Sequence, residues 1–133
     1  MRITIVQGAF LPVPPFRGGA IEKAFHALAR EFADSGHTVN YISRLCDGLP
    51  QNESEGSNLH HRRIRGYDTP KSLLKLKWLD LLYSLRARRK LPDADILLTH
   101  TFWLPMLARS SRAHGQLFVH VGRAPKGQMR LYK

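Results

Sequence analysis

The chain opens with a strand and a helix that constrain its fold more than any other feature. Residues 2–6, Arg-Ile-Thr-Ile-Val, are almost continuously apolar and β-branched, which is typical of a strand buried in a parallel sheet. Residues 20–35 carry apolar side chains at helical spacing, and Gly36 ends the helix. A buried strand followed by an amphipathic helix is the first half of a βαβ unit, so these residues predict a parallel sheet.

The same alternation of strands and helices continues to the end of the chain. We predict further strands at 38–43, 59–65, 96–99 and 116–121, and further helices at 71–90 and 102–113. Residues 47–58, rich in Gly, Asn, Ser and Glu, are predicted to be a loop, and the basic strand 59–65 is assigned to a sheet edge. The expected fold is α/β: one domain with a doubly wound parallel sheet of about five strands, order 3-2-1-4-5, and helices on both faces.

The loop after the first strand holds a candidate phosphate site, at Arg17, Gly18, Gly19 and Glu22. Unpaired N–H groups at the helix start attract anions, and glycines let the backbone approach a ligand closely. Arg17 would add a charge-assisted contact. Glu22 would either interact favourably with the helix dipole or bind an acceptor. The loop is not G-x-G-x-x-G, so the dinucleotide fingerprint does not apply. The alternative is a glycine pair that only shapes the turn.

Ligands of doubly wound sheets bind beyond the carboxyl ends of the strands, near the switch between strands 1 and 4. His100 follows the predicted fourth strand and His120 lies near the end of the fifth. We therefore expect both imidazoles to converge with the Arg17–Glu22 segment. The alternative for His120 is a buried strand histidine bonded to backbone, and for His100 a capping or packing role.

Positive charge is concentrated in the central third of the chain. Lys and Arg total 21 against 10 Asp and Glu, a net charge of +11, which attracts anionic partners. The predicted helix 71–90 is leucine-rich nearly all round and carries the basic residues Lys71, Lys75, Lys77, Arg86, Arg88, Arg89 and Lys90. This composition fits an anionic membrane surface. A helix packed on the sheet with snorkelling lysines, or a solvated basic face, are the alternatives.

Other features limit the cellular compartment in which the chain can reside and the disulfide and metal chemistry that it can carry. No apolar run approaches the roughly 20 residues that cross a bilayer, and the start lacks a signal-peptide pattern. A single cysteine, Cys46, excludes an internal disulfide and suits a reducing cytoplasm. His60 and His61 are adjacent and point to opposite faces of a strand, and His26, His37 and His114 lack ligand spacing, so we predict no metal site.

Five segments, in order and at matching spacing, resemble the N-terminal domain of a retaining glycosyltransferase of the GT-B fold, in glycosyltransferase family 4. They are Met1–Val6, Gly18–Glu22, Ser35–Val39, Asp95–Leu104 and Leu117–Gly122. Such enzymes have two Rossmann-like domains facing a cleft, the first holding mainly the acceptor and the second most of the nucleotide sugar. The resemblance implies that no metal or other cofactor is needed for the transfer.

By this resemblance, residues 1–133 form the acceptor-side domain of an enzyme that transfers a hexose from a nucleotide sugar to a sugar or lipid-linked acceptor. Gly18 and Gly19 would approach the donor diphosphate, and His120 would be the active-site histidine. The last residues begin an element that looks unfinished, so we expect a truncated chain that needs a missing C-terminal domain and is inactive alone. A cytoplasmic location, peripheral at the inner face of the membrane, follows as the expectation.

Two other functions remain open on the sequence alone. The chain could be a small Rossmann-like module that binds a phosphorylated metabolite, or a basic module for nucleic acid. Against nucleic acid, the chain lacks a recognition motif, and Phe102 and Trp103 are not interleaved with basic residues as a stacking platform requires.

Overall fold

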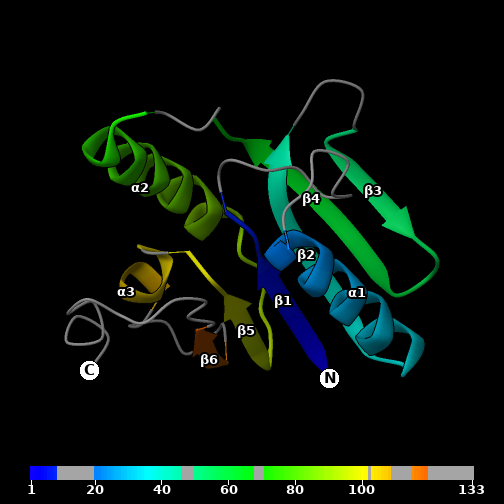
Figure 1. Cartoon of the computed structure of the whole chain (residues 1–133). Helices are drawn as coiled ribbons and strands as arrows, with labels where there is room; N and C mark the ends of the chain where they lie inside the picture. The colour runs from blue at the N-terminus through cyan, green and yellow to red at the C-terminus, as the bar shows by residue number, and fades with distance from the viewer. Residues whose placement is uncertain (9–19, 46–49, 68–70, 102, 109–114, 120–133) are drawn as a thin grey trace.

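The protein is described by a computed structural model at residues 1–8, 20–45, 50–67, 71–101, 103–108 and 115–119. Its elements are β1 (Arg2–Val6), α1 (Ala20–Asp34), β2 (Thr38–Leu45), β3 (Asn52–Glu55), β4 (Leu59–Arg65), α2 (Leu73–Lys90), β5 (Ile96–Thr99), α3 (Leu104–Ala108) and β6 (Gln116–Val119). The strands form one sheet with the order β3-β4-β2-β1-β5-β6 (Figure 1). Neighbouring strands are parallel, except that β3 is antiparallel to β4.

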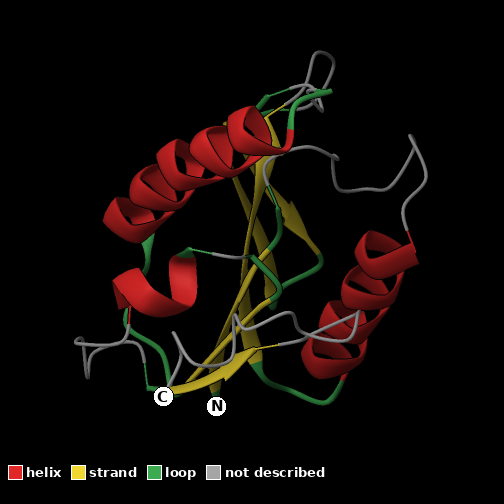
Figure 2. Ribbon diagram, turned by 60° about the vertical axis from the view of Figure 1, so that its left-hand side comes forward, coloured by secondary structure: helices red, strands yellow, loops and turns green. Residues whose placement is uncertain are grey.

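Helices cover both faces of the sheet, with α1 on one side and α2 and α3 on the other (Figure 2). Alternate residues of β1 supply the two cores because successive strand side chains point to opposite faces. Ile3 and Ile5 pack with Phe25 and Ala29 of α1, whereas Val6 joins the cluster that contains Tyr83 and Leu104 of the other layer. The predicted α/β, doubly wound fold with helices on both faces is confirmed.

Within the residues that the structure describes, the sheet has six strands rather than about five. Without β3, the observed order β4-β2-β1-β5-β6 is the predicted 3-2-1-4-5. The predicted loop 47–58 is wrong at Asn52–Glu55, which pair with β4, and the edge position predicted for residues 59–65 is therefore wrong as well. Positive φ at Gly56 (66°) lets the chain turn tightly between β3 and β4.

Charge explains why the polar segment Asn-Glu-Ser-Glu becomes a strand. Arg63 of β4 has no exposed surface, and its guanidinium donates to Glu53 Oε1 at 3.0 Å and to the Pro50 carbonyl at 3.0 Å. A buried cation is costly unless it is paired and hydrogen-bonded. Glu53 of β3 supplies that pairing, so the buried charge on β4 favours a neighbouring strand instead of marking an edge.

Helix ends follow local sequence signals. α1 ends in a Schellman motif, with Gly36 at φ 94° and with His37 N donating to the Phe32 carbonyl at 3.1 Å. Ser72 caps α2, whose last residue, Lys90, comes shortly before Pro92. α3 is described only at Leu104–Ala108, so most of the predicted 102–113 helix lies outside the described residues. Among the helices described, none is long and apolar enough to cross a membrane.

Candidate functional site

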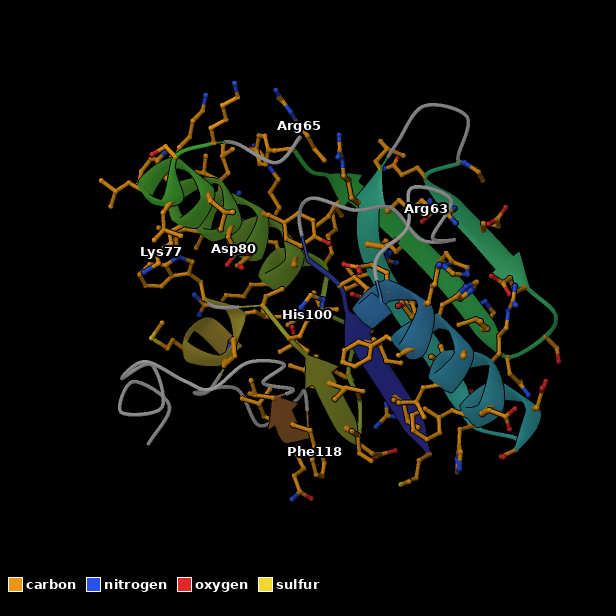
Figure 3. All side chains as sticks on the ribbon, viewed as in Figure 1. Arg63, Arg65, Lys77, Asp80, His100 and Phe118 are labelled. Carbon is orange, nitrogen blue, oxygen red and sulfur yellow. The ribbon has the colours of Figure 1, made fainter. Side chains whose placement is uncertain are left out.

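Hydrogen-bonding side chains gather where β1 and β5 end, next to Tyr41 in the middle of β2 and beside the first turns of α1. Gln7 directly follows β1 and His100 directly follows β5, and these two strands are parallel neighbours with Val6 opposite Thr99. α1 leaves β1 on one face of the sheet and α3 leaves β5 on the other, so this is the switch point of the doubly wound sheet. Figure 3 shows His100 at the centre of the molecule, close to the start of α1.

Gln7 is the centre of this cluster. Its side chain is completely buried, its Nε2 donates to Tyr41 Oη at 2.6 Å, and its Oε1 accepts from His100 Nε2 at 2.6 Å. Because the amide oxygen can only accept, the proton of a neutral His100 ring is on Nε2. The ring edge of His100 also meets Phe25 of α1, with centroids 5.5 Å apart and planes at 77°. Gln7 and Phe25 therefore fix both the tautomer and the orientation of the imidazole.

Two threonines hold the chain around His100. Thr99 is fully buried, and its hydroxyl donates to the Val6 carbonyl at 3.1 Å and accepts from the Thr101 backbone N–H at 3.2 Å. The two threonine hydroxyls are also 3.0 Å apart. These bonds join the end of β5 to the end of β1, so the position of His100 is set by backbone anchoring on either side of it.

Burial raises the pKa of two neighbouring groups, the Glu22 carboxyl and the Tyr41 phenol. Burial raises the pKa of Glu22, partly opposed by the hydrogen bond from its own backbone at the helix start. Burial likewise raises the pKa of Tyr41 well above its ordinary value, despite the Gln7 hydrogen bond, and the charges of Glu22 and Glu55 add to the rise. Tyr41 is therefore a neutral phenol. The cluster offers an imidazole, an amide, a phenol and a carboxyl group, which are suited to binding hydroxyl-rich ligands.

The predicted site residues fall into two groups. Glu22 and His100 both lie at this end of the sheet, as expected from their places after β1 and β5. Arg17, Gly18, Gly19 and His120 lie outside the described residues. Gln7 and Tyr41 were missed by sequence reasoning. A glutamine directly after a buried apolar strand was the available signal for the first, whereas nothing in the strand around Tyr41 distinguishes it from a core residue.

A second cluster joins two histidines and a glutamate, although His26 and His61 show no ligand spacing in the sequence. His60 and His61 do point to opposite faces, but His61 meets His26 of α1 and Glu55 of β3. One ligand-type atom from each of these three side chains lies within 4.8 Å of the others. Sequence spacing could not reveal this group because its members come from three elements, one of which was predicted to be a loop.

The predicted basic residues lie along α2 or just before it. All are exposed except the half-buried Arg86: Lys71, Lys75, Lys77, Arg88, Arg89 and Lys90. Arg86 donates to Tyr67 Oη and to the Arg65 carbonyl. A hollow of about 260 Å³ lies among Arg65, Arg86, Arg89 and Lys90. The cations in the last turn of α2 lie where they interact favourably with the negative end of the helix dipole.

The apolar side chains of α2 divide along its length. Its buried residues are Asp80, Tyr83, Ser84 and Ala87, towards the C-terminal half. Leu73, Leu74 and Trp78, in the first two turns, are 66%, 82% and 59% exposed. The later turns of α2 therefore pack on the sheet, whereas the first two turns leave these apolar side chains exposed.

Comparison with known proteins identifies the family. None of the curated proteins matches the chain. The model of Glycosyltransferase Family 4 matches residues 18–122, which include α1, every strand from β2 to β6, and His100. This match confirms the resemblance found in the sequence, and it covers most of the chain. The chain belongs to Glycosyltransferase Family 4 and corresponds to an N-terminal domain of that family.

Proposed function

We propose that this protein is the acceptor-side domain of a nucleotide-sugar-dependent glycosyltransferase, which transfers a hexose to a sugar or lipid-linked acceptor. The observation that carries the proposal is the Tyr41–Gln7–His100 chain of hydrogen bonds at the switch point of the sheet. Family membership supplies the reaction class. A doubly wound sheet binds ligands at this position, and a rigidly held imidazole is suited to a sugar hydroxyl.

The chemistry assigns each residue a task. During transfer the bond from the sugar's anomeric carbon to the donor phosphate breaks and a bond to an acceptor oxygen forms. Negative charge develops on the departing nucleoside diphosphate, which takes up the proton that the acceptor hydroxyl loses. Backbone N–H groups at Gly18 and Gly19, with the Arg17 guanidinium, would stabilise that charge. His100 and Glu22 would position sugar hydroxyls, and His120 would lie near the transferred hexose. No metal or cofactor is assigned to this reaction.

We propose further that the chain has little turnover alone, because the family resemblance assigns most donor contacts to a C-terminal domain. A domain of that kind would complete the donor site. Sugar binding by the isolated chain is then weak, and it tests the site without requiring catalysis.

A labelled-histidine NMR titration tests the proposal. Sugars of acceptor type, nucleotides and nucleotide sugars are added separately to protein carrying ¹³C in its histidine rings. We expect acceptor sugars to shift the His100 resonance, and His100→Ala to weaken binding at least tenfold. His60→Ala is the matched control, because His60 lies on β4 and bonds Ser54, away from the switch point. Binding that His100→Ala leaves unchanged would refute the acceptor site.

The same titration separates the alternatives. Tight binding of nucleotides or small phosphorylated metabolites, without sugar binding, would favour a metabolite-binding module. Oligonucleotide affinity that falls steeply with salt concentration would favour the nucleic-acid alternative.

The first turns of α2 support a membrane-surface role for the same domain. Leu73, Leu74 and Trp78 are exposed apolar side chains beside the exposed cations Lys71, Lys75 and Lys77. An apolar patch surrounded by lysines matches an interface rich in anionic lipid, such as the cytoplasmic leaflet of a membrane. We propose that α2 docks there, which would bring a lipid-linked acceptor to the domain.

Vesicle flotation tests this docking. The protein should float with vesicles that contain anionic phosphatidylserine and not with neutral phosphatidylcholine vesicles. The double variant Leu74→Ser/Trp78→Ser should lose flotation, whereas Leu45→Ser, which replaces a leucine 38% exposed at the end of β2, should keep it. Failure to float with either vesicle would contradict the docking and leave the sugar site unaffected.

A further inference from the structure

His26, Glu55 and His61 form a compact group on the α1 side of the sheet. Glu55 Oε1 accepts hydrogen bonds from His26 Nε2 at 2.8 Å and from His61 Nε2 at 2.7 Å. The two imidazoles therefore aim their Nε2 atoms at one point, although they come from a helix and a strand that lie 35 positions apart in the sequence. Three ligand-type atoms from three elements lie within 4.8 Å of one another.

The group is enclosed but reachable. The side chain of His61 has no exposed surface, and that of His26 is 6% exposed. Glu55 is 26% exposed and borders a hollow of about 320 Å³, lined also by Arg30, Asp34 and Leu59. An ion could thus enter beside the carboxylate and meet both imidazoles behind it.

Two imidazoles and one carboxylate are a donor set for zinc. Zn²⁺ takes nitrogen and oxygen ligands at about 2.0–2.2 Å, so its tetrahedral ligands lie roughly 3.3 Å apart. The two present N···O separations would lengthen by roughly half an ångström as the ion took the place of the Nε2 protons, and each neutral ring would then carry its proton on Nδ1.

Neighbouring charges set the strength of the site. Arg30 Nε donates to Glu55 Oε2 at 2.9 Å, which leaves Oε1 to face the imidazoles. An outer hydrogen bond of this kind orients a ligating carboxylate. Arg63 is the other nearby cation, and Glu53 pairs with it. Two guanidinium groups close to the ion lower its affinity, so we expect micromolar rather than tighter binding.

We propose that His26, Glu55 and His61 bind one Zn²⁺ ion, with water as the fourth ligand. The ion joins α1 to the β3–β4 hairpin and has a structural role. Its position is next to Tyr41, whose ring centroid is 5.5 Å from that of His61 and 6.2 Å from that of His26. Zinc would therefore also hold the phenol that bonds Gln7 at the switch point. This inference does not depend on the sugar-transfer proposal.

Zinc titration of the full chain without an affinity tag is the experiment. Other groups could compete for the ion, among them the Met1 amino group, which is 3.0 Å from His37 Nδ1, and the thiol of Cys46. The background therefore carries His37→Gln and Cys46→Ser. Competition with a chromophoric chelator gives stoichiometry and affinity, and Co²⁺ reports geometry, since tetrahedral Co²⁺ has intense visible absorption bands.

We expect one equivalent of Zn²⁺, a tetrahedral Co²⁺ spectrum, and a rise in Tm of roughly 5–10 °C at a hundredfold excess over Kd. His61→Gln should weaken binding by at least tenfold, and His60→Gln, the adjacent residue on the opposite face, should not. If His61→Gln does not fold, His26→Gln replaces it. A folded background protein that binds no zinc, gives no tetrahedral Co²⁺ spectrum, or binds equally in both histidine variants would overturn the proposal.

Discussion

Replacing Gln7 with leucine tests whether the buried bridge holds the site together. Gln7 is fully buried and makes one bond to Tyr41 and one to His100, each of 2.6 Å. Leucine is of similar size but cannot bond either partner. Two hydrogen bonds, each contributing about 0.5–1.5 kcal/mol, are lost, and the buried Tyr41 hydroxyl loses its bond to Gln7. We therefore expect Gln7→Leu to lower the free energy of unfolding by about 2–4 kcal/mol.

The companion change Tyr41→Phe leaves the Gln7 amide without its acceptor, and we expect it to cost about 1–3 kcal/mol. In the double variant, leucine faces phenylalanine. Neither the unpaired Tyr41 hydroxyl nor the unpaired Gln7 amide of the single variants is then present. The double variant should consequently be more stable than the sum of the single losses predicts, by about 1–2 kcal/mol. The coupling is expected because the two side chains contact each other in the folded protein.

Urea unfolding at pH 7.5, followed by far-ultraviolet circular dichroism with chelator present, measures the four free energies of this cycle. A cooperative transition with equal m-values in all four proteins would show that the midpoint shifts report stability. Losses that add within about 0.3 kcal/mol would refute the bridge, because contact between the two groups requires coupling.

Three further predictions follow from single positions. Gly115 has φ 73°, and a Cβ there would lie 2.1 Å from the Asp95 carbonyl oxygen, whereas Gly56 has φ 66° with open space around it. In urea unfolding, Gly115→Ala should therefore lower the free energy of unfolding by at least about 2 kcal/mol more than Gly56→Ala. Equal losses would contradict this packing. Because the folded-state pKa of Glu22 is raised above 4.5, its ionisation costs stability as pH rises through that raised pKa. The Glu22→Gln variant should therefore have a higher Tm than the unchanged protein at pH 7.5 and lose this advantage below pH 4.5. A lower Tm for the variant at pH 7.5 would contradict the shift. Asp95 Oδ2 accepts a hydrogen bond from the Arg2 backbone N–H at 2.8 Å, at the amino end of β1 and far along the strand from Gln7. Asp95→Asn should lower Tm by a few degrees without changing sugar affinity. A loss of affinity in the NMR titration would place Asp95 in the site instead.

The sequence by itself determined the layered fold and one edge of the site. Apolar runs such as residues 2–6 and the periodic helix α1 specify their own structure, because burial of one face or both is already written in the spacing of the side chains. Handedness rules then order the strands, and the ends of β1 and β5 place Glu22 and His100 near the switch point.

Only the tertiary structure decided which polar side chains meet. The segment Asn52–Glu55 lacks any apolar pattern and becomes a strand because Arg63, buried on β4, needs an acidic partner. The pairing of Gln7 with Tyr41, and of Glu55 with two histidines, joins residues that are 34, 29 and 6 positions apart. Such contacts depend on how sheet and helix pack in three dimensions, and local spacing carries no record of them, because a hydrogen bond acts only over the last few ångströms between atoms already brought together.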